Sequence, residues 1–109
     1  MINQLVLVGR LTKNPELRYT NEGTPFATIT LAVSRHYRNQ EGEVEADFVN
    51  VTLWRKTAEN TVSYCKKGAV VGVTGKVQSR SFENQQQQRV YVTDIVADYV
   101  KFLSNKLEK

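Results

Sequence analysis

Two aromatic side chains, Phe48 and Trp54, are placed six positions apart in a segment with the alternation of a β-strand. Residues at every second position of a strand share a face, so one face here is aliphatic and the other carries Phe48, Asn50, Thr52 and Trp54. At about 3.3 Å per residue the rings are about 20 Å apart, which leaves room for a few unstacked nucleotides. This pattern predicts stacking of flat ligands rather than bond chemistry.

A strand buried on both faces would instead place both rings in the core. The same arrangement recurs in residues 69–82, which favours exposed rings. One face of that segment is aliphatic, and the other is polar, basic and aromatic: Thr74, Lys76, Gln78, Arg80 and Phe82. Two outward rows that combine aromatic and basic side chains indicate a surface for an aromatic, anionic ligand.

Catalytic chemistry has little support in the sequence. A metal-dependent nuclease would need clustered ligands, yet Asp94 and Asp98 are four positions apart in a strand and therefore more than about 12 Å distant. His36 is the single histidine, and it falls in the polar row of a strand. The lone Cys65 falls on the apolar side of an expected helix, where a small buried hydrophobe is expected. We therefore expect no enzyme activity, no metal site and no cofactor.

The composition favours an anionic partner. The 109 residues suffice for one domain, and 15 Lys and Arg against 11 Asp and Glu give a net charge of +4. Nucleic acid is the leading class of partner. A single cysteine, no export signal and no apolar run of about 20 residues predict a cytoplasmic protein that does not span a membrane.

The first strand, within residues 2–12, is apolar on both faces. Leu5, Leu7 and Leu11 fall on the core side, and Val6 and Val8 fall on the other. The second face needs a cover, either a loop or helix of the same chain or another copy. We expect a homo-oligomer.

The other elements follow from local signals. Residues 17–20 form a short strand, and residues 26–38 alternate as a long one whose core row would include Tyr37 unless the strand twists or bulges. Thr57 caps a helix of about ten residues that ends at Gly68 with Lys66 and Lys67 in its last turn. Residues 83–88 form a mobile loop. The last strand, residues 89–103, changes parity around Asp94, where a bulge is expected, with Tyr99 in the later core row.

Three strands, a short helix and two more strands predict an all-β fold, a five-stranded Greek-key barrel of the OB type. The helix between the third and fourth strands separates it from SH3-like barrels. Glycines at 72 and 75 permit the coiling that a small barrel requires. The domain spans residues 1–103, and residues 104–109 form a frayed polar end.

Five blocks of the sequence resemble the bacterial single-stranded DNA-binding protein family: QLVLVGRL at residues 4–11, NPELRY at 14–19, ITLAV at 29–33, LWRKTAE at 53–59 and YCKKG at 64–68. Together they are highly specific, and the resemblance covers residues 1 to 103. It implies an OB-fold homotetramer, associated with the nucleoid, that coats single-stranded DNA in replication, recombination and repair.

The resemblance also implies site residues. The stacking aromatics would be Tyr37, Phe48, Trp54 and Phe82, which implies that Tyr37 is exposed. The phosphate contacts would be Lys56, Lys67 and Arg80, with Arg10, Arg35 and Lys76 as further candidates.

The sequence departs from the family pattern in two ways. Several members carry tryptophan where this chain has Tyr37, Phe48 and Phe82, so stacking would use smaller rings. The acidic, Phe-ending tail that recruits other proteins is missing, so recruitment through it is not expected. Short paralogues that lack the tail, including ones tied to DNA uptake, and phage-borne copies are both compatible with this pattern, and so is a sequence that is one piece of a longer protein. A protein-interaction module of the primosomal OB type and weaker RNA binding stay open, because nothing here distinguishes the 2'-hydroxyl.

Overall fold

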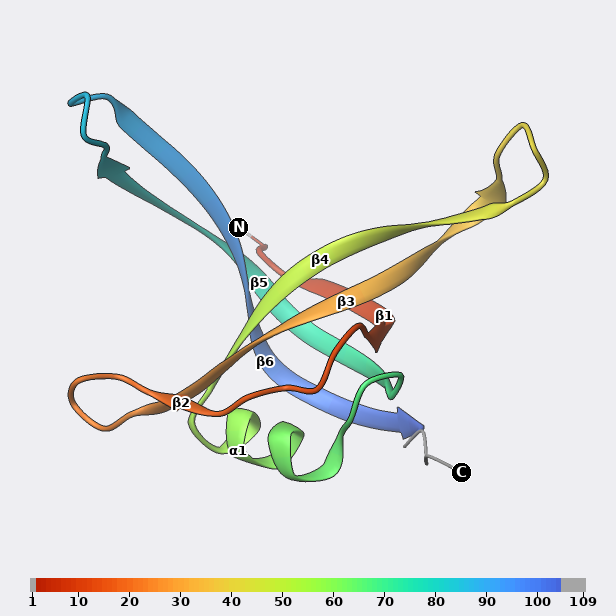
Figure 1. The fold of residues 1–109 in the computed structure, drawn as a ribbon, viewed down its shortest axis with the longest axis horizontal. Helices are drawn as coiled ribbons and strands as arrows, with labels where there is room; N and C mark the ends of the chain where they lie inside the picture. The colour runs from red at the N-terminus through yellow and green to blue at the C-terminus, as the bar shows by residue number, and fades with distance from the viewer. Residues whose placement is uncertain (1, 105–109) are drawn as a thin grey trace.

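The computed structural model describes residues 2–104, apart from the side chains of His36 and Tyr37. The chain is almost entirely β-strand with one helix (Figure 1). In order, the elements are β1 (Leu5–Leu11), β2 (Arg18–Tyr19), β3 (Pro25–Arg38), β4 (Val44–Trp54), α1 (Arg55–Tyr64), β5 (Val70–Glu83) and β6 (Arg89–Ser104). The frayed end was expected at residues 104–109. Ser104 is the last residue of β6, and residues 105–109 and the exposure of Tyr37 lie outside the described residues.

The sheet closes on itself as a barrel. Its strands follow the order β1-β5-β6-β4-β3-β2, and β1 also pairs with β3 through Arg10 with Ala32 and Leu11 with Leu31. The β4–β6 pairing is parallel, at Val51 with Ile95, and the others are antiparallel. Five long strands therefore form the closed barrel, as predicted, and β2 is a two-residue addition at the edge of β3.

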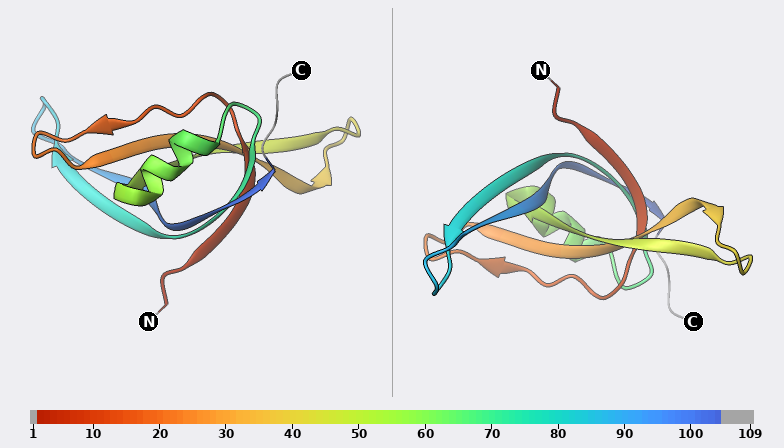
Figure 2. Two further views of the ribbon diagram at one scale, coloured as in Figure 1. Left: turned by 90° about the horizontal axis from the view of Figure 1, so that it is seen from below. Right: turned by 90° about the horizontal axis from the view of Figure 1, so that it is seen from above.

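The core follows the alternation of the long strands. Alternate residues of β3, β4 and β5 point inward and are fully or almost fully buried: Ala27, Ile29, Leu31, Val51, Leu53, Val71 and Val73. The helix α1 buries Ala58 and contacts β3, β4 and β6. Seen from below, it lies in front of the barrel (left view of Figure 2). Since one row of each strand fills the core, the other row of β3, β4 and β5 is left for the surface.

The predicted start of the helix was wrong. The helix begins at Arg55, directly after β4, and Trp54 is its N-cap without a side-chain hydrogen bond. Arg55 has φ +57°, a left-handed backbone that turns the strand into the helix, so no cap by Thr57 is involved. The helix ends at Tyr64, which leaves Lys66 and Lys67 in the following loop.

The predicted position of the β6 bulge was also wrong. The register shifts between Thr74, opposite Tyr99, and Gly75, opposite Ala97, so Asp98 is the extra residue rather than Asp94. A Cβ at position 75 would clash with the carbonyl oxygen of Val96, so the strands approach most closely where glycine allows it. As a result Tyr99 is 61% exposed and the core position passes to Val100.

Two long hairpins project beyond the barrel and diverge (Figure 1). We call β3–β4 the first arm and β5–β6 the second arm. The turn of the second arm, expected as a mobile loop, is organised by Asn84, whose Oδ1 accepts hydrogen bonds from the backbone N–H of Gln86 and Gln88, both at 2.9 Å. The arms extend the outward rows away from the core.

Candidate nucleic-acid interface

The first arm has one continuous outward face. Cross-strand partners at even positions of β3 and β4 share it: Phe26 with Trp54, Thr28 with Thr52, Thr30 with Asn50 and Ala32 with Phe48. Phe48 is 70% exposed and Trp54 is 40% exposed, so neither ring is part of the core. The prediction that these two rings share an outward row is confirmed.

Phe26 supports Trp54 from across the sheet. The ring centroids are 5.3 Å apart and the planes are inclined by 34°. A neighbouring aromatic at this distance restricts the indole while leaving part of its surface open to solvent. Sequence reasoning did not name Phe26 as a site residue, although its even position in a strand with an odd core row indicated the exposed face.

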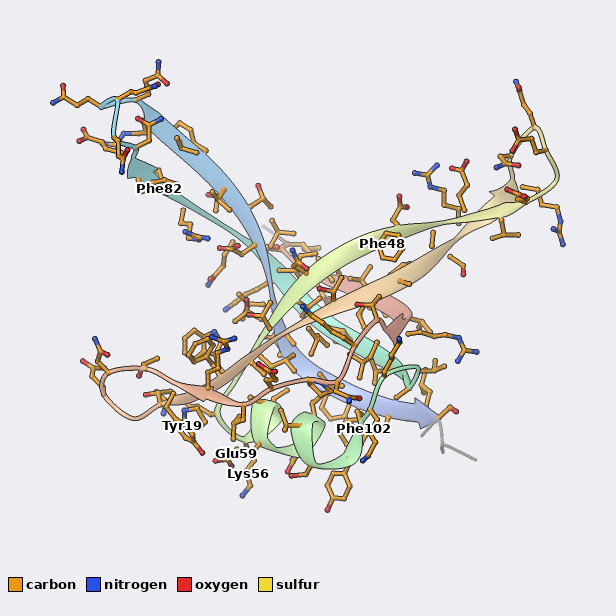
Figure 3. All side chains as sticks on the ribbon, viewed as in Figure 1. Tyr19, Phe48, Lys56, Glu59, Phe82 and Phe102 are labelled. Carbon is orange, nitrogen blue, oxygen red and sulfur yellow. The ribbon has the colours of Figure 1, made fainter. Side chains whose placement is uncertain are left out.

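The second arm presents a matching face. Even positions of β5 carry Gln78, Arg80 and Phe82, and Phe82 is 45% exposed. Figure 3 shows Phe48 and Phe82 on different arms. Arg80 Nε donates a hydrogen bond of 2.6 Å to Asp94 Oδ2 on β6. The second arm therefore combines an exposed ring with a paired arginine.

The outward faces of the two arms meet in a cleft of about 320 Å³, which we call the arm cleft. Its lining comes from all four long strands of the arms: Phe26, Thr28, Thr52, Trp54, Gln78, Arg80, Asp94 and Val96. The fold thus brings Trp54 and Arg80, which are far apart in the sequence, to one concave site. A flat ring with a nearby cation suits a nucleotide.

A second hollow of about 450 Å³ continues from the arm cleft along the first arm. The two share Phe26 and Thr28. The second hollow is also lined by residues of the β1–β3 connection, including Lys13, Glu16 and Arg18. Sequence reasoning missed Lys13 and Arg18, because the place of Lys13 depends on the path of a connecting segment and that of Arg18 on the pairing of β2 with β3, where Arg18 is opposite Phe26.

The arginine candidates are engaged in contacts within the chain. Arg35 forms a bidentate contact with Asp47, with Nη2 at 2.8 Å from Oδ1, and also contacts Glu45. These hydrogen bonds from Arg35 hold the pKa of Asp47 below its usual value. Both acidic residues are at odd positions of β4, on the face opposite Phe48. Arg10 Nη1 donates to the carbonyl of Gly68 at 3.0 Å.

The lysine candidates are free of such contacts. Lys56, Lys67 and Lys76 make no side-chain hydrogen bond or ion pair with any group that the structure describes. Lys76 shares the outward face of the second arm with Arg80, whereas Lys56 is on α1, away from Phe48 and Phe82 (Figure 3). Their ammonium groups are available to an anionic ligand.

Comparison with known proteins identifies the family. The model of the single-strand binding protein family matches residues 2–103. The chain belongs to this family. Single-stranded DNA-binding protein B of Bacillus subtilis (strain 168) is 58% identical over 106 residues, 97% of this chain and 94% of that protein. Single-stranded DNA-binding protein A of the same strain is 57% identical over 97% of this chain and 62% of its own length.

A solved structure agrees with the fold. A crystal structure of a deletion mutant of the single-stranded DNA binding protein from Thermus aquaticus matches with a TM-score of 0.78 and 25% identity. The match covers 94% of this chain and 51% of that chain, so the present chain spans about half its length. The predictions of the family and of the OB-type barrel are confirmed.

Other reactive groups of this member of the single-strand binding protein family lie outside the clefts. Cys65 is buried, and burial raises the pKa of its thiol, as expected for a small core residue. Among the described side chains, which exclude that of His36, no group of three or more His, Cys, Asp or Glu could hold a metal ion. No described helix is long and apolar enough to cross a membrane.

Proposed function

We propose that this chain binds and coats single-stranded DNA independently of sequence. The observation that carries the proposal is the arm cleft, where Trp54 and Arg80 line one concave site. Exposed Phe48 and Phe82 extend it on the two arms, and Tyr37 is proposed as a fourth stacking residue. The names of the two Bacillus subtilis relatives, single-stranded DNA-binding proteins B and A, support the same function.

Binding requires no bond chemistry. A base that stacks on an aromatic ring gains about 1 to 3 kcal/mol, and every base offers such a face, so sequence matters little. In duplex DNA those faces are already stacked on one another, which favours single strands. The outward rows of the arms therefore select unpaired nucleotides by their exposed faces.

Phosphate contacts complete the proposed interface. Lys56, Lys67 and Lys76 provide charges that make no ion pair with any described residue, and Lys76 shares the face of the arm cleft. Arg80 reaches phosphate through its terminal nitrogens, which make no hydrogen bond with the described residues. Arg10 and Arg35 remain candidates, although both are held by contacts within the chain. Neutralised phosphates release counterions, so affinity falls with salt.

The assembly we propose is a homotetramer. Val6 and Val8 are 67% and 52% exposed on β1 and adjoin a hollow of about 560 Å³. β1 pairs with β3 only at Arg10 and Leu11, so among the described residues its other positions offer a free edge on that side. An apolar face beside an unpaired edge favours pairing with another copy.

The cellular setting follows from the proposed binding. A sequence-independent coat on single strands serves replication, recombination, repair or DNA uptake, and locates the protein with the nucleoid in the cytoplasm. RNA would bind more weakly as an alternative ligand. Recruitment of proteins through an acidic tail forms no part of the proposal. Catalysis forms no part of it either, because stacking and phosphate contacts suffice for binding.

Fluorescence titration tests the proposal directly, because Trp54 is the single tryptophan. Oligo-dT should quench it, and the affinity should fall at least about 100-fold between about 50 and about 200 mM salt. The control is a duplex oligonucleotide of the same length, which should bind far more weakly. Equal affinity for duplex and single strand, or no response to salt, would contradict the proposal.

A further inference from the structure

The arm cleft has no net charge, although the chain carries +4. Among the described residues that line it, two belong to the charged residue types, Arg80 and Asp94, and they form an ion pair with each other. The Nε–Oδ2 distance of 2.6 Å makes this a short, charge-assisted hydrogen bond. A cleft proposed to bind a polyanion therefore contains a carboxylate beside its one arginine.

The register of the second arm holds this pair on the ligand side. Gln78 is opposite Asp94 and Arg80 is opposite Val92, so the pair is diagonal on the face that carries Phe82. The side chain of Asp94 is 31% exposed and that of Arg80 is 61% exposed. The carboxylate is thus the less accessible partner, and the terminal nitrogens of the more exposed Arg80 make no hydrogen bond with the described residues.

A purely structural role does not account well for the pair. Exposed ion pairs contribute little to stability, and fourteen cross-strand residue pairs already hold β5 and β6 together. The pair has a larger effect on the binding of an anionic ligand than on the stability of the fold. An arginine that already has an anion beside it releases fewer counterions to phosphate, and the carboxylate repels the phosphate that arrives.

We propose that Asp94 is an affinity-limiting residue of the arm cleft, an inference that rests on the proposed binding of single-stranded DNA. In the free protein Asp94 neutralises Arg80. In the complex it stays within reach of any phosphate that Arg80 contacts. DNA therefore leaves the cleft faster than it would leave the same cleft without this charge, and Arg80 contributes less to affinity than its position suggests.

The substitution D94N tests the proposal. Asparagine keeps the size and an oxygen that can accept the hydrogen bond from Arg80, and removes only the charge. The matched control is D98N, which changes the net charge equally on the same strand, at the exposed bulge outside the cleft. We expect D94N to bind oligo-dT about 3- to 10-fold more tightly, with a salt slope steeper by about 0.7, and D98N to change affinity less than about 2-fold.

A double-mutant cycle isolates the pair. R80Q should weaken binding about 2-fold in the natural background and about 10-fold in the D94N background, because only there is the arginine free of a competing anion. Dissociation measured by stopped flow should be slower for D94N than for the natural chain. Circular dichroism checks the fold of each variant, and D94S takes the place of D94N if the latter fails to fold.

The outcomes separate this inference from the proposed function. If the natural chain does not bind oligo-dT, both are overturned. If it binds, but D94N or its substitute D94S binds no more tightly than the natural chain, or no more tightly than D98N, only the role of Asp94 is overturned. Tighter binding confined to the variants at position 94, with the expected coupling to Arg80, supports it.

Discussion

Phe26 and Trp54 are direct cross-strand partners on the outward face of the first arm, with ring centroids 5.3 Å apart. Phe26 lines both the arm cleft and the second hollow that continues from it, and Trp54 lines the arm cleft. Phe26 thus restricts the indole on one side, and the rest of the indole surface is left to meet a base. The two rings should contribute unequally to binding.

Loss of the indole should cost more than loss of its support. We expect W54A to weaken binding of labelled oligo-dT about 10- to 100-fold, which corresponds to the stacking of one to two bases. F26A should weaken it about 3-fold, because the indole remains but is less restricted. Fluorescence anisotropy of the labelled strand measures both, since W54A removes the intrinsic signal. Equal losses for the two variants would contradict the assignment of Trp54 as the stacking ring.

Two exposed rings on opposite faces of the second arm test which face of that arm binds DNA. Phe82 is 45% exposed on the face of Arg80, while Tyr91, opposite Ser81, is 74% exposed on the other face. F82A should therefore weaken DNA binding about 5-fold, and Y91A should change it less than about 2-fold. Anisotropy titrations of the two variants at one salt concentration give the comparison. A larger loss of affinity in Y91A than in F82A would show that DNA binds to the face of Tyr91 and not to the face of Phe82.

The alternation of β4 was enough to predict the exposed row that contains Phe48 and Trp54, because a filled core fixes the direction of every second side chain. The position of the β6 bulge could not be predicted in the same way. Asp94 marked the change in apolar pattern, but the extra residue is Asp98, where the backbone of β6 passes close to Gly75. That approach is a tertiary property, absent from the local pattern.

The candidate site shows the same division. Arg80 belonged to a recognisable outward row, yet its pairing with Asp94 depends on the register between two strands. Lys13 carried no signal, because it lies in a connecting segment without periodicity, and the short strand expected at residues 17–20 did not indicate that Arg18 would line the second hollow. The pattern within one strand therefore predicts which side chains face outward, whereas contacts between side chains of different elements are known only from the three-dimensional fold.

The two glycines of β5 should differ in what they tolerate. A Cβ at Gly75 would clash with the Val96 carbonyl oxygen, whereas one at Gly72 would make an ordinary 3.6 Å contact with Leu103 Cδ1. We expect G75A to lower the free energy of unfolding by about 2 to 3 kcal/mol and G72A to change it by less than about 1 kcal/mol. Urea denaturation followed by circular dichroism measures both. Similar stability of the two variants would show that the bulge yields at Gly75.

The buried thiol predicts slow chemical modification. Cys65 is 2% exposed and its pKa is raised by burial, so at pH 8 a smaller fraction is thiolate than in the unfolded chain. A disulfide reagent should therefore react at least about 100-fold more slowly with the folded protein than with the protein in guanidinium chloride. The thiolate that the reagent releases absorbs light, and its rate of appearance gives the rate of reaction in each condition. Equal rates would mean that α1 opens readily from the barrel.

The exposed face of β1 gives the test of assembly. Val8 is 52% exposed beside the hollow that adjoins the free edge of β1, and Val44, at the start of β4 in the first arm, is 49% exposed without adjoining it. Because a charge buried between copies costs far more than one left in water, V8E should lower the molar mass from that of a tetramer towards a dimer or monomer, while V44E should leave it unchanged. Light scattering after size exclusion measures the mass of each variant at matched concentration. A natural chain that is already monomeric would show that the copies do not associate. An equal loss of mass in V44E would show that the exposed face of β1 is not specifically responsible for assembly.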